Sequence, residues 1–165
     1  MELRPELLEQ YRPALDRAVG LLAIRARSRR EIEQRLLRAG YDEEVVSMVL
    51  YKLEREKLLD DEDFSVQWVE SRKRKYGSTR IAMELRMKGV DPETAEAALA
   101  CCSEEDELET AAALARRKIK SDRDSCDRRK LFQRVTAFLV RRGYSWDIAK
   151  KAFEEALEEP SDDDW

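Results

Sequence analysis

Apolar residues recur along the chain at the three- and four-residue spacing of amphipathic helices. The pattern is clearest before three glycines, Gly40, Gly89 and Gly143, which follow one another at a period of about 50 residues. The apolar residues eight and four positions before each glycine are Ile32 and Leu36, Ile81 and Leu85, and Val135 and Leu139. The pattern therefore predicts three copies of a helix that ends at a glycine.

The residues after each glycine predict a second helix. An apolar residue comes first and a helix-capping residue second: Tyr41 and Asp42, Val90 and Asp91, and Tyr144 and Ser145. Apolar residues at helical spacing follow in all three copies. A glycine in the left-handed conformation closes one helix and lets the chain turn into the next. Each copy is therefore expected to contain a helical hairpin.

A further helix is expected ahead of each hairpin. In the first copy Leu15, Val19 and Leu22 mark its apolar stripe, and Ser28 begins a capping box for the helix that follows. In the second copy, acidic residues 61–63 begin it, Phe64 and Trp68 face the core, and Gly77 ends it. In the third copy it begins at residues 104–107, and a polar connector follows at residues 121–126.

This arrangement is an all-α fold without a β-sheet, an elongated stack of three tandem three-helix modules. No module can cover its own apolar face, so the modules stack on one another. We place an N-terminal extension at residues 1–12, the modules at 13–59, 60–102 and 103–158, and an acidic disordered tail at 159–165.

The composition of the chain reduces the number of function classes that are expected. The 165 residues include 32 Lys and Arg against 36 Asp and Glu, for a net charge of −4, and no His. Without His there is no Ser-His-Asp or Cys-His nucleophile and no imidazole zinc site, so we expect no enzyme, no metal and no cofactor. Cys101, Cys102 and Cys126 suit neither a disulfide framework nor a four-thiolate site and are expected as reduced thiols. With no apolar span or leader pattern, we expect a cytoplasmic monomer.

Basic residues gather at the same place in each copy, where the first helix ends. The clusters are Arg72, Lys73, Arg74 and Lys75 with Arg80; Arg25, Arg27, Arg29 and Arg30; and Arg116, Arg117, Lys118 and Lys120. One interpretation is that these residues complement helix C-termini and form a solvated face. The other is that they form a basic stripe that binds a polyanion or an acidic protein surface. The first set is the strongest contact candidate.

Three central segments resemble the signature of the RecX family: 57–64 (KLLDDEDF), 68–72 (WVESR) and 76–90 (YGSTRIAMELRMKGV). Segments 21–32 and 139–144 are similar to the flanking family segments. The resemblance runs from about residue 15 to residue 157. The chain departs from it at Lys57, where a small residue is common, at Ser65, where Ala is usual, and in the longer connector near Cys126.

The resemblance implies a bacterial regulator of the RecA recombinase. Such a protein would lie in the groove of the RecA filament on single-stranded DNA and inhibit ATP hydrolysis, strand exchange and co-protease activity, with at most weak direct contact to DNA. Two alternatives remain open from the residues alone. One is a helical repeat protein that binds single-stranded nucleic acid directly, which the net negative charge disfavours. The other is a general helical scaffold for protein interactions.

Overall fold

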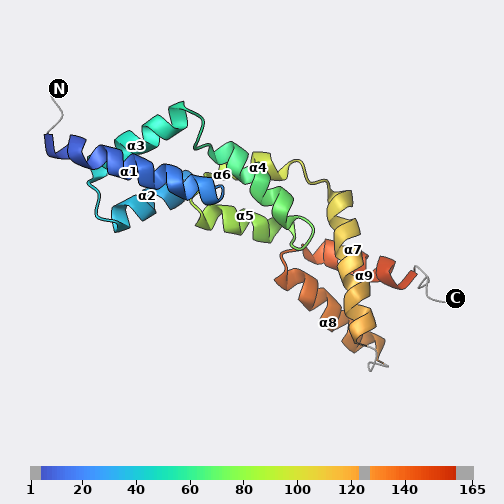
Figure 1. The fold of residues 1–165 in the computed structure, drawn as a ribbon. Coiled ribbons are helices and arrows are strands. Elements are labelled where there is room, and N and C mark those ends of the chain that lie inside the picture. Colours follow the sequence, from blue (N-terminus) through green and yellow to red (C-terminus); the bar gives the residue numbers. More distant parts are fainter. Residues whose placement is uncertain (1–4, 123–126, 159–165) are drawn as a thin grey trace. The chain divides into compact units, whose positions relative to one another are not determined.

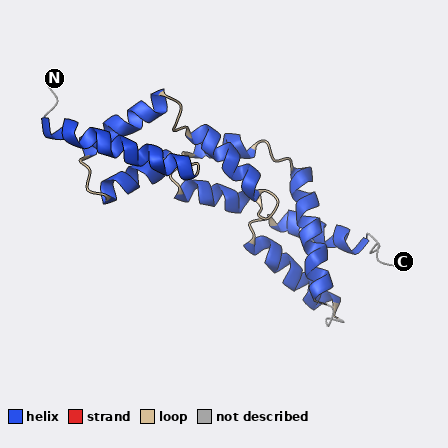
Figure 2. Ribbon diagram, in the orientation of Figure 1, coloured by secondary structure: helices blue, strands red, loops and turns tan. Residues whose placement is uncertain are grey.

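The computed structural model describes residues 5–122 and 127–158, and these residues form nine helices and no strand (Figures 1 and 2). The predicted all-α fold of three-helix modules is confirmed. The first module contains α1 (Pro5–Ile24), α2 (Arg29–Arg38) and α3 (Glu43–Arg55); the second contains α4 (Asp61–Arg72), α5 (Ser78–Met87) and α6 (Pro92–Leu99); the third contains α7 (Glu104–Ser121), α8 (Arg128–Arg141) and α9 (Trp146–Glu158). None of the described helices is long and apolar enough to cross a membrane.

The three glycine turns adopt the predicted left-handed backbone. Gly40, Gly89 and Gly143 have φ of 89°, 79° and 90°. In each copy the N–H of the next residue donates to the carbonyl five residues back, at 3.3 Å in the first copy and 3.2 Å in the other two. This is the hydrogen bond of a Schellman motif, which satisfies a carbonyl left free at the helix end. The same short turn thus ends α2, α5 and α8.

The predicted helix caps are also confirmed. Ser28 and Glu31 form a complete capping box at the start of α2. Side-chain oxygens of Asp42, Asp91 and Ser145 accept backbone N–H groups at the starts of α3, α6 and α9. Asp60 caps α4 through the N–H of Glu62 at 2.9 Å. These caps satisfy donors that a helix leaves free in its first turn.

Residues 5–12 of the expected N-terminal extension are helical, since α1 begins at Pro5, and Leu7 is buried against the core. Two local expectations need correction. Val19 is 42% exposed, because α1 turns the smaller Ala14 and Ala18 inward. The helix α4 ends at Arg72, before Gly77, because the N–H of Gly77 is bound by the third module.

The chain divides into two compact units, residues 1–67 with 85–95 and residues 68–84 with 96–165, so α4, α5 and α6 each contribute to both. The core of the first unit includes Ile32, Leu36, Leu50 and Leu53, which are fully buried or nearly so. The core of the second unit has small residues on α7 facing larger ones on α8 and α9: Ala111, Ala112 and Ala115 against Val135, Leu139 and Phe153. The alanines let α7 and α9 pack closely.

A similar joint connects successive modules within each unit. In the first unit the hydroxyl of Ser28 donates to the carbonyl of Lys88 at 2.6 Å, and Gly89 lies directly against the side chain of Arg30. In the second unit the N–H of Gly77 donates to the carbonyl of Arg142 at 3.0 Å, and Gly143 lies against Arg80. The two joints are therefore built alike. In each, the glycine at the end of one module's second helix packs on the first turn of the preceding module's second helix.

Glu31 strengthens the joint of the first unit. Its carboxylate accepts hydrogen bonds from Arg25 at 2.9 Å and from Lys88 at 3.1 Å, together with the backbone N–H of Ser28. Burial alone would raise the pKa of Glu31, but the bonds from Arg25 and Lys88 outweigh it and lower that pKa to about 2. The charged form of Glu31 is therefore stabilised in the folded state.

We expect Glu31→Gln to lower the free energy of unfolding at pH 7 by about 1 to 2 kcal/mol, a range reduced for solvent screening. The pKa of Glu31 falls from 4.5 to about 2 on folding, so its contribution is complete above pH 4.5 and is lost as the pH falls through 2. Urea unfolding of both proteins from pH 7 to pH 2 measures this. A stability difference that stays constant across that range would show that charge is not the cause.

Candidate functional site: a basic groove in the second unit

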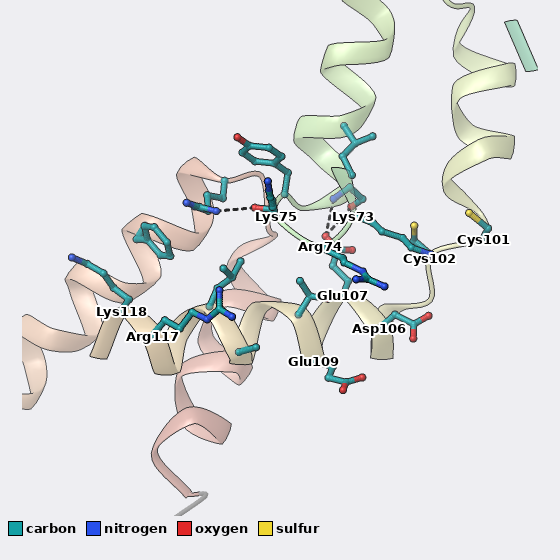
Figure 3. Close-up of a pocket in the computed structure, with 18 of the residues that line it drawn as sticks. Lys73, Arg74, Lys75, Cys101, Cys102, Asp106, Glu107, Glu109, Arg117 and Lys118 are labelled. Atoms are coloured by element: carbon teal, nitrogen blue, oxygen red, sulfur yellow. Dashed lines mark hydrogen bonds between the residues drawn. The ribbon is translucent and has the colours of Figure 1, made fainter. Parts of the chain in front are cut away.

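The second unit carries an open groove with a volume of about 1190 Å³. It is bordered by the turn between α4 and α5, one face of α7, the connection between α6 and α7, and the end of α8 (Figure 3). Apolar side chains of Ile81, Leu114 and Phe138 contribute to its lining. The groove is thus built from segments of the second and third modules.

The charge of the groove is mixed, with an excess of cations. Among the residues that the structure describes, six basic ones line it, Lys73, Arg74, Lys75, Arg117, Lys118 and Arg142, against three acidic ones, Asp106, Glu107 and Glu109. The side chains of Arg74, Lys75 and Arg117 are exposed, and no residue in the described part of the chain pairs with them. These three cations are therefore available to a ligand without any internal ion pair being broken.

Hydrogen bonds between modules hold the turn that carries Arg74 and Lys75. The Glu107 carboxylate accepts the N–H of Ser78 at 2.8 Å and its hydroxyl at 3.1 Å, which places an acid at the N-terminus of α5. The Arg142 guanidinium donates to the carbonyl of Lys75 at 3.1 Å (Figure 3). The turn is thereby fixed against α7 and the end of α8.

Three guanidinium groups surround the ring of Tyr76. They belong to Arg80, Arg72 and Arg142, at 4.2, 5.7 and 5.8 Å from the ring centroid. The Glu84 carboxylate pairs with Arg80 at 3.2 Å and with Arg72 at 3.4 Å. It also accepts the indole N–H of Trp68 at 3.1 Å. Because cation–π contacts and ion pairs hold the guanidinium groups, Arg72 and Arg80 belong to a fixed arginine–aromatic cluster beside the groove.

The predicted contact residues of the second and third basic clusters lie in three places: in the groove, on α7 outside the groove, and in the arginine–aromatic cluster. Lys73, Arg74 and Lys75 meet Arg117 and Lys118 in the groove, so parts of the second and third basic clusters come together. Within this set Lys73 pairs with Glu70 at 2.6 Å and Lys118 with Asp122 at 3.9 Å. Arg116 and Lys120 are on α7 but do not line the groove, and Arg72 and Arg80 lie in the arginine–aromatic cluster.

The first basic cluster lies in the first unit and is engaged within it. Arg25 pairs with Glu31 at 2.9 Å, and Arg29 pairs with Glu54 at 2.7 Å. Arg27 is only 7% exposed, and its Nε donates to the carbonyl of Leu21 at 3.2 Å. Arg30 packs on the glycine of the next module. These contacts give the cluster a structural role, and its alignment with the other clusters in one stripe stays a prediction.

Sequence reasoning missed Arg142 and Tyr76 as parts of the site. Arg142 lies over both Phe138 at 4.7 Å and Tyr76 at 5.8 Å. The sequence contained one signal for Arg142, because it precedes Gly143 as Lys88 precedes Gly89. In the structure, Arg142 and Lys88 both lie in joints between modules. Tyr76 had no comparable signal, because its neighbours come from α4, α5 and the end of α8.

The thiols on the groove are adjacent but differ in environment. Cys101 is exposed, and its thiol donates to the carbonyl of Ala98 at 2.9 Å. Burial and the neighbouring Cys101 raise the pKa of Cys102 to about 11, so Cys102 is a neutral thiol at physiological pH and a poor nucleophile. Cys126, also expected as a reduced thiol, lies outside the described residues.

Tyr144 is a core residue of the second unit near Glu107, one of the acids of the groove. It is 2% exposed, and its hydroxyl has no hydrogen-bond partner among the described residues. Burial and the nearby Glu107 carboxylate raise the pKa of Tyr144 to about 12. The ring therefore contributes packing, while the hydroxyl is buried at a cost.

We expect Tyr144→Phe to leave the protein as stable as the wild type or more stable by up to about 1 kcal/mol, because it removes a buried hydroxyl that forms no hydrogen bond to any described residue. Thermal unfolding followed by circular dichroism measures this, with Tyr41→Phe at the equivalent, half-exposed position of the first module as the control. A loss above about 1 kcal/mol at Tyr144 would show that the hydroxyl has a partner, such as a buried water.

Three family profiles match the chain, described as RecX first, second and third three-helix domain, over residues 14–53, 60–99 and 104–153. A protein from Amycolatopsis mediterranei named "Regulatory protein RecX" is 39% identical over 160 residues, which is 96% of this chain and 90% of its relative. The chain belongs to the RecX family.

Other RecX proteins agree with this assignment. The regulatory protein RecX of Corynebacterium efficiens is 40% identical over 87% of this chain and 73% of its own length. The crystal structure of RecX from Lactobacillus salivarius has the same fold, with a TM-score of 0.84 at 22% identity over 91% of this chain and 98% of that one. The relatives from Amycolatopsis mediterranei and Corynebacterium efficiens are both named regulatory proteins.

Proposed function

We propose that this RecX protein is a negative regulator of the RecA recombinase that binds the RecA filament on single-stranded DNA and inhibits its ATPase, strand exchange and co-protease activities. The observation that carries the proposal is the basic groove, in which Arg74, Lys75 and Arg117 are exposed and unpaired within the described chain. Family membership supplies the partner. The protein acts in the cytoplasm, as a monomer and without a cofactor.

The mixed charge of the groove supports a protein–DNA filament as the partner. Its cations can contact phosphates or acidic side chains, while Asp106 and Glu109 at the other end of the same α7 face can contact basic side chains (Figure 3). A surface with both signs favours one orientation on a filament that itself presents protein and DNA. A groove for DNA alone would gain nothing from these carboxylates, because they repel phosphates.

The test is an ATPase assay with RecA, single-stranded DNA and this protein at substoichiometric amounts. We expect inhibition that grows with added protein and is already clear below one molecule per RecA, which would indicate end-capping of the filament over uniform coating. Sedimentation of the filament should carry the protein with it. If purified RecA filaments neither bind the protein nor lose ATPase activity, the proposal is wrong and a general interaction scaffold is favoured.

A second candidate function is direct binding of single-stranded nucleic acid. It is favoured by Tyr76 and Phe138, two rings that line the groove among cationic side chains, since stacking rings in a basic groove are typical of such binders. This function requires tight association with bare DNA that weakens steeply as salt is raised. Weak binding to bare DNA at moderate ionic strength, with strong binding to the filament, would exclude it.

A further inference from the structure

The α7 wall of the groove is a long helix face that stays accessible in the folded chain. Asp106, Thr110, Leu114, Arg117 and Ser121 line the groove from this wall, and their three- and four-residue spacing places them in a single stripe. The alanines of α7 that belong to the core lie on the other side of the helix. The stripe is about 22 Å long, because a helix rises about 1.5 Å per residue. Its length suits a second helix of about four turns.

Charge changes sign along this wall. Asp106 and Glu109 line its N-terminal part, and Arg117 and Lys118 line its C-terminal part, with Leu114 between them (Figure 3). Glu109 and Arg117 are exposed, and neither has a partner among the described residues. A ligand that matches this wall therefore carries cations at one end, acids at the other and an apolar group between them.

The other wall of the groove is basic. Lys73, Arg74 and Lys75 line it on the turn between α4 and α5, and Arg142 lines it at the end of α8. Hydrogen bonds to Glu107 and from Arg142 hold this turn in place before any ligand binds. The side of a ligand that faces this wall is therefore acidic.

These features favour a protein helix over a nucleic acid strand as the occupant. The basic wall attracts phosphates, but Asp106 and Glu109 repel them over the N-terminal half of α7. Helices are stabilised by acids in the first turn and cations in the last turn, because of the helix dipole. A helix of this common kind matches α7 when it runs antiparallel to it. Its acidic first turn then faces Arg117 and Lys118, and its basic last turn faces Asp106 and Glu109.

We propose that the groove binds an amphipathic helix of RecA, antiparallel to α7, with an apolar residue on Leu114 and an acidic side against Arg74 and Lys75. This inference deepens the proposed function and rests on it for the partner. It assigns the groove to the protein part of the filament, so the single-stranded DNA does not enter the groove.

The sign of one substitution tests the occupant. Glu109→Lys changes an exposed acid of the α7 wall, which has no partner among the described residues, into a cation. A helix with cations at this end should bind the variant about fivefold more weakly, whereas phosphates in the groove would bind it more tightly. Sedimentation of RecA filaments on single-stranded DNA with each protein measures the shift. Tighter or unchanged binding of the variant would overturn the proposal.

Glu154→Lys is the matched control. Glu154 is an exposed acid of α9 that pairs with no described residue and does not line the groove. The change in net charge is the same, so filament binding should shift by less than about twofold. Equal losses in the two variants would show that net charge is the cause and contradict the proposal. Failure of the wild type to bind the filament would contradict the proposed function and, with it, RecA as the source of the helix.

Photo-cross-linking tests the helix and its direction. Thr110→p-benzoylphenylalanine in one variant and Ser121→p-benzoylphenylalanine in another place a photoreactive group at two points of the stripe. These points are about 16 Å apart along α7, which corresponds to about 11 residues of a helix or about five residues of an extended chain.

Mass spectrometry of irradiated filaments should place both cross-links in RecA, about 11 residues apart, with the cross-link from position 121 closer to the N-terminus of RecA. Cross-links to DNA would show that phosphates occupy the groove and would overturn the proposal. A separation of about five residues would contradict a helix, and the reverse order of the two cross-links would contradict the antiparallel direction.

Discussion

Reversal of the three free groove cations, by Arg74→Glu, Lys75→Glu and Arg117→Glu together, should raise the concentration needed to inhibit the RecA ATPase by about tenfold or more. Each side chain is exposed and unpaired within the described residues, so reversal breaks no ion pair or hydrogen bond among them. The change removes three attractive charges from one groove and replaces them with repulsive ones. Inhibition curves for wild type and variant on the same filament measure the effect.

The matched control is the triple reversal Arg12→Glu, Arg17→Glu and Arg38→Glu, which has the same change in net charge on the first module. It should inhibit within about twofold of the wild type, because separated surface charges are screened at physiological salt. Helicity and thermal midpoint should be unchanged in both variants. Full inhibition by the groove variant would remove the groove from the mechanism, and equal losses would leave only net charge as the cause.

Arg72 and Arg80 are unsuitable for this experiment, although the sequence ranks them among the best contact candidates. Both share the Glu84 carboxylate, and Arg72 lies over the Trp68 ring at 4.5 Å. Reversal of either would place a new carboxylate next to Glu84, which is only 16% exposed. A loss of inhibition would then report a damaged fold as well as a lost contact.

Gly143→Ala should lower the free energy of unfolding by about 3 kcal/mol or more. The φ of Gly143 is +90°, where any side chain is strained. An added Cβ would also lie 2.6 Å from the backbone nitrogen of Arg80, which cannot move without opening the joint of the second unit. Urea unfolding of wild type and variant measures the loss.

The other glycines separate backbone strain from the steric clash. Gly40 has almost the same φ, +89°, but an added Cβ would meet nothing within 4 Å, so Gly40→Ala should cost only about 1 kcal/mol. Gly20 lies within α1 with open space around it, and Gly20→Ala should stabilise the protein by up to about 1 kcal/mol. Equal losses at Gly143 and Gly40 would contradict the joint as the source of the effect.

The parts of the fold that follow from local chemistry could be predicted from the sequence. The glycine turns, the capping box at Ser28 and the start of α6 at Pro92 depend on residues within one or two helical turns, so the sequence pattern contains them. The helix end that the sequence did not predict correctly depends on a residue far away in the chain. Gly77 does not continue α4 because its N–H is bound by Arg142, which lies far along the chain.

The candidate site, too, could be predicted from the sequence only in part. The basic clusters are visible in the sequence, but the contacts of their members are not. Arg27 is buried and donates to a carbonyl, Arg29 pairs with Glu54, and Arg74 has no partner among the described residues. All three are basic residues after the first helix of a module, and no local feature separates them. The difference arises from which neighbours the packing of the modules brings within a few ångströms of each guanidinium.

By itself, the sequence determined the all-α class and the threefold repeat of helical modules, because periodic burial and helix capping are local properties that repeat every module. The family followed from the resemblance of segments 57–64, 68–72 and 76–90 to the RecX signature. Only the tertiary structure decided which cations lack a partner among the described residues, that Lys73, Arg74 and Lys75 share a groove with Arg117 and Lys118, and that Tyr76 lies among three arginines. Those outcomes depend on contacts between residues far apart in the chain, which come together only when the modules pack at their glycine joints.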